Sequence, residues 1–226
     1  MEIKEILAHP SNYTKGRKQK IEYIVVHYTA NNGDTAEGNG KYFSGADRNT
    51  SAHYFVDEDK VVQSVLDKNT AWHCGAKTYK HKKCRNENSI GVEMCSEKNN
   101  EGQYEINQKT QLNAVEVVKW LMKKYHIPVE NVLRHYDVTG KLCPEPLVKN
   151  QKLWLDFKQK LLQSKEVQKE MVYNYIDENM PAWARPTIQK LVDKGALQGN
   201  EKGELLLTDV MLRIFVANDR AGAYDK

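Results

Sequence analysis

The chain has 226 residues and a mass of 26.1 kDa, enough for one large domain or for one substantial domain with a smaller one. Hydrophobic residues make up 40% and charged residues 28%, a composition that excludes collagen-like, fibrous and wholly disordered chains. The net charge of +4 is spread along the chain, so nothing in the charge calls for nucleic acid as a partner. No aliphatic run approaches the roughly 20 residues of a membrane span, and we expect no membrane insertion.

The first part of the chain begins with strand patterns. Ile21 to His27 is apolar and β-branched with little alternation, which predicts a strand buried on both faces. A polar, glycine-rich stretch follows it. Residues 52–56 and 61–65 then predict a hairpin of two short strands joined by a charged turn, and residues 89–94 predict another short buried strand.

A helix is predicted over residues 107–126, where apolar side chains recur every three or four positions between a capping Asn107 and a stop at Pro128. Strand character resumes at 132–135, and residues 153–162 predict a closing helix. Strands that alternate with helices predict an α/β domain.

We expect this first domain to span residues 1–163, followed by a polar linker at 164–169 and a small, mainly helical module at 170–226. The side chains expected to be buried on the last helix, which starts after a threonine cap, are Met211, Ile214 and Phe215. The module has neither histidine nor cysteine and is similar to a single S-layer-homology-like repeat. Wall binding, self-association into a homo-oligomer and simple capping of the first domain all stay open for it.

The four cysteines follow none of the paired spacings of metal-binding or redox motifs. The first ten residues lack the basic head and apolar stretch of a secretory signal, so we expect synthesis in the cytoplasm without a signal peptide. That compartment favours free thiols or metal ligands over disulfides. The nearest candidate for a bridge is Cys74 with Cys84.

Three side chains stand where a cleft would display them. His27 ends one predicted strand, His135 ends another, and Cys143 follows eight residues later. Two imidazoles and a thiolate would leave the fourth position of a tetrahedral zinc ion open, as in catalytic zinc sites. Spacing alone does not decide between this site and ordinary packing of the same side chains, because no compact motif links the three.

Five motifs, in this order between residues 20 and 162, decide the interpretation: IVVHYTA, SAHYFVDEDKVVQSV, AWHCG, NSIGVEM and RHYDVTGKLCP. Together they resemble the zinc-dependent N-acetylmuramoyl-L-alanine amidases, a family that includes phage lytic amidases and peptidoglycan recognition proteins. The resemblance implies a mixed central sheet flanked by helices. It also implies that zinc is the cofactor and that its ligands are His27, His135 and Cys143.

The resemblance assigns catalytic roles to Glu93 and Lys141. Hydrolysis of an amide requires a polarised carbonyl, a deprotonated water and a protonated leaving nitrogen. Glu93 would carry the proton, and Lys141 would place a cation beside the developing oxyanion. The side chains expected to support or line the substrate site are His53, Trp72 and His73, with plain packing left open for the two histidines.

The implied function is hydrolysis of the amide between the lactyl group of N-acetylmuramic acid and L-alanine in bacterial peptidoglycan. We expect a phage or prophage endolysin that acts on the wall after release, with a host autolysin as the second setting. Residues 77–85 carry five Lys or Arg and no acid, so they either contact anionic wall polymers or form a solvated loop. The alternatives in other classes are a non-catalytic peptidoglycan-binding module and a thiol hydrolase with Cys143 as nucleophile.

Overall fold

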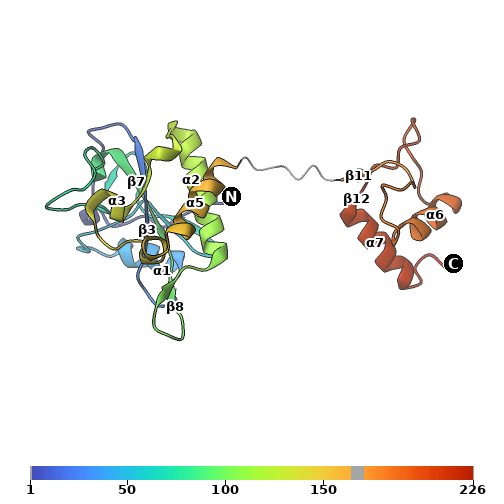
Figure 1. Cartoon of the computed structure of the whole chain (residues 1–226), viewed down its shortest axis with the longest axis horizontal. Helices are drawn as coiled ribbons and strands as arrows, with labels where there is room; N and C mark the ends of the chain where they lie inside the picture. The colour runs from blue at the N-terminus through green and yellow to red at the C-terminus, as the bar shows by residue number, and fades with distance from the viewer. Residues whose placement is uncertain (1, 164–170, 226) are drawn as a thin grey trace. The chain divides into compact units, whose positions relative to one another are not determined.

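The structure is a computed structural model that describes residues 2–163 and 171–225 (Figure 1). The chain divides into two compact units, residues 1–163 and 164–226. The linker predicted at 164–169 lies outside the described residues. Among the helices of the described ranges, none has the length and apolar character needed to cross a bilayer.

The first unit contains ten strands and five α-helices among its described residues. Its strands are β1 (Lys4–Glu5), β2 (Tyr13–Thr14), β3 (Tyr23–Tyr28), β4 (Tyr54–Val56), β5 (Val61–Gln63), β6 (Thr70–Ala71), β7 (Ser89–Met94), β8 (Glu97–Lys98), β9 (Tyr104–Glu105) and β10 (Val132–Arg134). Its α-helices are α1 (Ala36–Ser44), α2 (Gln108–Tyr125), α3 (His135–Thr139), α4 (Glu145–Lys149) and α5 (Gln151–Leu162). Three short 3-10 helices are η1 (Pro10–Asn12), η2 (Asn86–Asn88) and η3 (Val129–Asn131).

Six strands form the central sheet, in the order β1-β5-β4-β7-β3-β10. The strands β4, β7, β3 and β10 run parallel to one another, whereas β5 is antiparallel to β4 and parallel to β1. The predicted mixed sheet is therefore confirmed. The parallel strands end at the same edge of the sheet, which is where α/β proteins place their ligands.

The two faces of the sheet pack against different elements. Because successive side chains of a strand point to opposite faces, Ile24 and Val26 of β3 face a core built with α2 and α5, which lie side by side in Figure 1. The alternate residues Tyr23 and Val25 pack instead with Val138 of α3. Burial on both faces explains why β3 has no polar alternation.

The predicted helix at 107–126 is present as α2. The Asn107 side chain accepts a hydrogen bond from the backbone N–H of Lys109, which caps the first turn. The helix ends at His126, whose left-handed backbone (φ 54°) turns the chain away. Its apolar stripe covers the sheet as the periodicity predicted.

Helix α1 was not predicted, because it falls in the stretch that appeared only polar and glycine-rich. Thr35 caps it by accepting a hydrogen bond from the backbone N–H of Gly38. A Cβ at Gly40 would lie 2.9 Å from Val62 Cγ1 and 3.0 Å from Ile6 Cβ. The glycine that lowers helix propensity thus lets α1 pack closely on the sheet.

The second unit holds strands β11 (Val172–Tyr173) and β12 (Leu207–Thr208) and helices α6 (Arg185–Asp193) and α7 (Asp209–Arg220). The two strands pair antiparallel, a feature that the sequence did not suggest. Its core gathers apolar residues from both helices and from the strands, namely Tyr173, Met180, Ala184, Ile188, Leu191, Leu207, Leu212 and Val216.

The expected buried face of α7 was wrong in two of its three residues. Met211 and Ile214 are 44% and 54% exposed, whereas Leu212 and Val216, one turn apart, are buried and Phe215 packs beside them. The apolar stripe of α7 is wider than the surface that one partner helix can cover, so half of it remains outside. All four cysteines are free thiols, so the candidate bridge between Cys74 and Cys84 is not formed.

Candidate active site

The sheet register brings the candidate residues together. His27 of β3 is the direct neighbour of Glu93 on β7, and both point to the face opposite α2 and α5. Arg134 of β10 pairs with Val26, so His135 enters α3 at the same edge of the sheet. Helix α3 then ends at Gly140, whose φ of 86° turns the chain so that Cys143 returns beside His135. The backbone N–H of Tyr136 donates to the carbonyl oxygen of Cys143 (2.9 Å), which holds this return.

The side chains of His27, His135 and Cys143 form a compact, buried donor cluster. One nitrogen or sulfur atom from each lies within 4.8 Å of the other two. Cys143 Sγ is 3.7 Å from His27 Nδ1, and the two imidazole centroids are 4.7 Å apart. His135 Nδ1 is buried without a hydrogen-bond partner. Two imidazole nitrogens and one sulfur, with a nitrogen left unsatisfied, are the donor set that zinc takes, so the residues fit this ion.

Electrostatics keep both imidazoles in the form that binds metal. Burial lowers the pKa of His27 well below its ordinary value. Burial, assisted by the charge of Lys141, lowers the pKa of His135 to about 4. Burial also raises the pKa of the Cys143 thiol to about 12, so the thiolate needs a cation beside it. An activated thiol nucleophile needs the opposite shift, and the structure therefore disfavours the thiol-hydrolase alternative.

Glu93 lies next to this cluster and has one carboxylate oxygen that is not used in a hydrogen bond. Its Oε1 is 3.9 Å from His27 Nδ1, and its Oε2 is buried without a hydrogen-bond partner. Burial raises the pKa of Glu93 to about 8, an effect that the charge of Lys141 opposes and that of Asp34 increases. The carboxyl can therefore exchange a proton near neutral pH.

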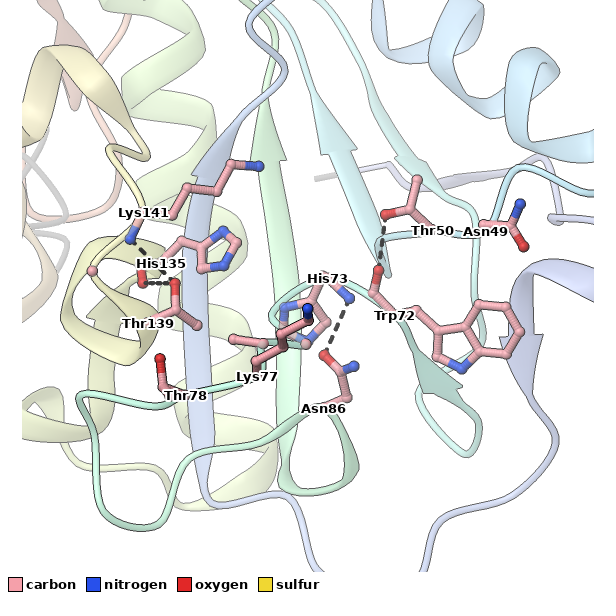
Figure 2. Close-up of a pocket in the computed structure, with 13 residues that line it drawn as sticks. Asn49, Thr50, Trp72, His73, Lys77, Thr78, Asn86, His135, Thr139 and Lys141 are labelled. Carbon is pink, nitrogen blue, oxygen red and sulfur yellow. Dashed lines mark hydrogen bonds between the residues drawn. The ribbon is translucent and has the colours of Figure 1, made fainter.

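Two cavities meet at the donor cluster. One, of about 670 Å³, is lined by residues that include His27, Glu93, Lys141 and Cys143. The other, of about 620 Å³, is drawn in Figure 2, which shows His135 and Lys141 on one side, Trp72 on the other and His73 between them. Residues that line both cavities are Thr50, His73, His135 and Lys141. The candidate ligands thus lie in a cleft that continues on both sides of them.

The three expected substrate residues have different surroundings. Trp72 lines the second cavity, and its Nε1–H donates to Thr14 Oγ1 at 2.9 Å. His53 is 0% exposed, with Nδ1 accepting from the backbone N–H of Gly91 and Nε2 lying 2.6 Å from Arg17 Nη2. The whole ring of His53 is enclosed by protein, which favours the supporting or packing role that the sequence left open for it. His73 lines both cavities, but it is nearly buried and its Nδ1 lies 3.0 Å from His27 Nε2.

Sequence reasoning missed two charged residues that support the site. Arg17 donates to the carbonyl oxygens of Asp67 (2.5 Å) and Ser89 (3.0 Å), tying a loop to the start of β7. Asp34 accepts from the backbone N–H of Ser96 and from the side chain of Thr29, both at 3.0 Å, and lines the first cavity. Asp34 follows the end of a parallel strand, a position that could have marked it. Arg17 stands among other basic residues, and nothing in the sequence distinguishes it.

The sequence model of the N-acetylmuramoyl-L-alanine amidase family matches residues 17–146 of the chain. The chain belongs to this amidase family. The matched range includes all three candidate ligands together with Glu93 and Lys141. The resemblance seen in the five motifs is thereby confirmed.

Two curated relatives show how far the likeness of this amidase extends. The N-acetylmuramoyl-L-alanine amidase CwlL of Bacillus licheniformis is 36% identical over an aligned length of 161 residues, and the match covers 66% of this chain and 44% of CwlL. The N-acetylmuramoyl-L-alanine amidase BlyA of Bacillus subtilis (strain 168) is 30% identical over an aligned length of 200 residues, and the match covers 83% of this chain and 51% of BlyA. The amidase thus spans about half the length of these relatives.

Solved structures match the amidase over nearly three quarters of its length. The structure of PlyL is 35% identical with a TM-score of 0.61, and the match covers 74% of this chain and all of that one. The catalytic domain of XlyA is 29% identical with a TM-score of 0.60, covering 71% of this chain and 99% of that domain. These likenesses agree with the mixed α/β sheet described above.

Proposed function

We propose that this amidase hydrolyses the amide between the lactyl group of N-acetylmuramic acid and L-alanine in peptidoglycan. In this proposal one zinc ion is held by His27, His135 and Cys143. The observation that carries it is the buried donor cluster at the wall of a cleft, with the unpartnered carboxylate oxygen of Glu93 beside it. Family membership and the names of the relatives support the choice of bond.

A zinc ion bound there supplies a Lewis acid that polarises the carbonyl and acidifies water. Glu93 accepts the proton of the attacking water and returns it to the departing nitrogen. Its Oε2 is buried and has no hydrogen-bond partner in the protein, so this oxygen is available to take the proton. Lys141, which lines both cavities, places a positive charge where the substrate oxygen becomes negative.

The non-catalytic alternative would need an incomplete site. Here the donor cluster, Glu93 and Lys141 all line one cavity, so every group that the reaction requires is present together. A peptidoglycan-binding module has no need of a buried carboxylate beside three metal donors. The arrangement therefore favours the enzyme.

The test uses the full chain, defined muropeptides and mass spectrometry of the products. We expect a free lactyl carboxylate and a new L-alanine amino terminus, loss of both on treatment with a chelator, and recovery on addition of zinc. Cys143→Ala is the matched inactive control. Cleavage of a different bond, or activity that resists the chelator but not a thiol alkylator, would refute the proposal.

We propose that the remaining partners are also at the cell wall. Lys77 lines the second cavity, and Lys80, Lys82 and Lys83 line a separate hollow of about 520 Å³. Arg85 instead packs on Tyr79, 3.7 Å from the ring centroid. The lysines are the groups that would contact anionic wall polymers, and the second unit would retain the amidase on the wall or pair two copies. Sedimentation with walls that have or lack their anionic polymers tests the lysines, and the mass of the chain in solution tests pairing.

A further inference from the structure

The second nitrogen of the buried His27 ring has a partner of its own. Nδ1 faces the site, 3.7 Å from Cys143 Sγ and 3.9 Å from Glu93 Oε1. Nε2 points away from it and lies 3.0 Å from His73 Nδ1. A neutral imidazole carries one proton, so only the nitrogen without it can offer a lone pair to a metal. The position of that proton therefore decides whether His27 can serve as a ligand through Nδ1.

The hydrogen bonds beyond His73 settle where the proton lies. Ser89 Oγ donates to the carbonyl oxygen of Arg85 at 2.6 Å, and a carbonyl oxygen can only accept. The hydroxyl proton of Ser89 is thus used, and the 3.2 Å contact between Ser89 Oγ and His73 Nε2 requires the proton of His73 Nε2. His73 Nδ1 is then an acceptor, and His27 Nε2–H must donate to it. Nδ1 of His27 is left with its lone pair directed toward Cys143.

The strand beneath His73 is shaped for its ring. A Cβ at Gly91 of β7 would lie 2.6 Å from His73 Cγ and 2.9 Å from its Nδ1. Such an approach is too close for any residue with a side chain, so only glycine at this position leaves room for the imidazole. This accounts for the glycine between Ser89 and Glu93, which neither the metal cluster nor the turn geometry requires.

We propose that His73 is a positioning residue that, through Ser89 and the carbonyl oxygen of Arg85, fixes His27 in the tautomer with Nδ1 free for zinc. The proposal rests on the zinc site proposed above and replaces the role in the substrate groove that the sequence suggested for His73. Hydrogen-bond partners of ligand histidines fix ring orientation and tautomer in metal sites, and their loss weakens metal affinity by about 10- to 100-fold.

The direct test is the tautomer of His27 in the metal-free wild-type chain. Two-bond correlations between ring protons and nitrogens in a sample with ¹⁵N-labelled histidine identify the protonated nitrogen. We expect His27 to carry its proton on Nε2 and His73 to carry its proton on Nε2 as well. A proton on Nδ1 of His27 would overturn the proposal, and this measurement requires no variant.

Zinc affinity, measured by competition with a chromophoric chelator, provides the second test. His73→Leu removes the acceptor, and we expect affinity to fall by about 10- to 100-fold. His73→Asn returns an oxygen close to the position of Nδ1 and should recover most of the loss, which a residue needed only for packing would not show. Equal affinity of His73→Leu and wild type, or no recovery in His73→Asn, would overturn the proposal.

Glycine variants test the same inference without changing a histidine. Gly91→Ala should displace the His73 ring and lower zinc affinity in the same direction as His73→Leu. Gly75→Ala is the matched control, because its Cβ would meet only Asn86 Nδ2 at an ordinary 3.4 Å, and it should leave affinity unchanged. Unchanged affinity in Gly91→Ala, or an equal loss in Gly75→Ala, would count against the role of His73.

The results separate this inference from the proposed reaction. A wild-type chain that binds zinc with His27 protonated at Nε2, yet cleaves no muropeptide, would refute the proposed reaction but not the positioning role of His73. A chain that cleaves muropeptides with His27 protonated at Nδ1 would support the reaction and refute the positioning role of His73.

Discussion

Replacing Glu93 by glutamine should stabilise the metal-free amidase at high pH and inactivate the zinc-loaded amidase. Burial raises the pKa of Glu93 from 4.5 to about 8, so the folded state keeps a proton that the unfolded chain releases. A raised carboxyl pKa gives stability that is complete below pH 4.5 and is lost as the pH rises through 8. At about 1.36 kcal/mol for each pH unit, this loss amounts to roughly 3 to 4 kcal/mol between pH 5 and pH 8. Glutamine has nearly the same size and no proton to lose.

The assay is urea unfolding of wild type and Glu93→Gln, both stripped of metal, at several pH values from 5 to 8. The buried histidines titrate in both proteins, so the difference between the two free energies of unfolding isolates Glu93. We expect the variant to gain roughly 3 to 4 kcal/mol relative to wild type across this range. A difference that does not change with pH would refute the reasoning, because it would mean that Glu93 ionises normally in the folded protein.

The same variant loaded with zinc should keep its metal and lose about 10²- to 10⁴-fold in turnover, the usual contribution of a positioned proton carrier. The stabilised protein would then be the inactive one. Near-normal turnover on muropeptides would contradict the role of Glu93 while leaving the stability prediction intact.

Four further predictions follow from the site and the fold. Alanine at any one of the three candidate ligands should reduce bound zinc sharply, as measured by metal analysis of the purified variant, and stoichiometric zinc in all three variants would contradict the site. Lys141→Ala should retain zinc but turn over about 10²- to 10³-fold more slowly, whereas Lys152→Ala on α5 should match wild type. A fragment of residues 1–163 should fold and cleave soluble muropeptides at the full-length rate but lyse whole walls less well; an insoluble fragment would contradict the division into units. Gly40→Ala should cost about 1 to 3 kcal/mol in thermal or urea unfolding because of its contact with Val62, and an unchanged midpoint would mean that α1 shifts freely.

The sequence predicted the parts of the fold that depend on local pattern. Strand β7 occupies the predicted residues 89–94, because a short apolar run between polar flanks can be buried only as a central strand. Helix α2 begins at the predicted cap, because the Asn107 side chain bonds a backbone N–H of the first turn, which is a local interaction. Helix α1 could not be predicted, because glycine at position 40 allows the close approach of the helix to Val62. That contact is between distant parts of the chain, and local helix propensity does not reflect it. The side of α7 that stays exposed, with Met211 and Ile214, likewise depends on how the rest of the second unit packs against the helix, which the sequence pattern does not show.

The candidate site was predictable to the extent that its residues belong to motifs. The five motifs named the donor cluster, Glu93 and Lys141, and the structure brings these together. The surroundings of His53 and His73 were not predictable, because they depend on register. His53 is enclosed by Arg17 from a distant loop, and His73 reaches His27 only because β7 carries glycine at Gly91. Side chains that act through other side chains leave little mark on a sequence.

The cleft is open on both sides of the donor cluster, since Thr50 and His73 line the cavity on each side. A polymer can therefore lie across the amidase from the side, with its chain leaving in both directions, and no free end has to be threaded into the protein. Under the proposed reaction, every stem peptide along a glycan strand of a cross-linked wall is then a point that the cleft could reach. Each cut detaches a stem from its strand, so the load that the cross-link carried passes to the neighbouring links.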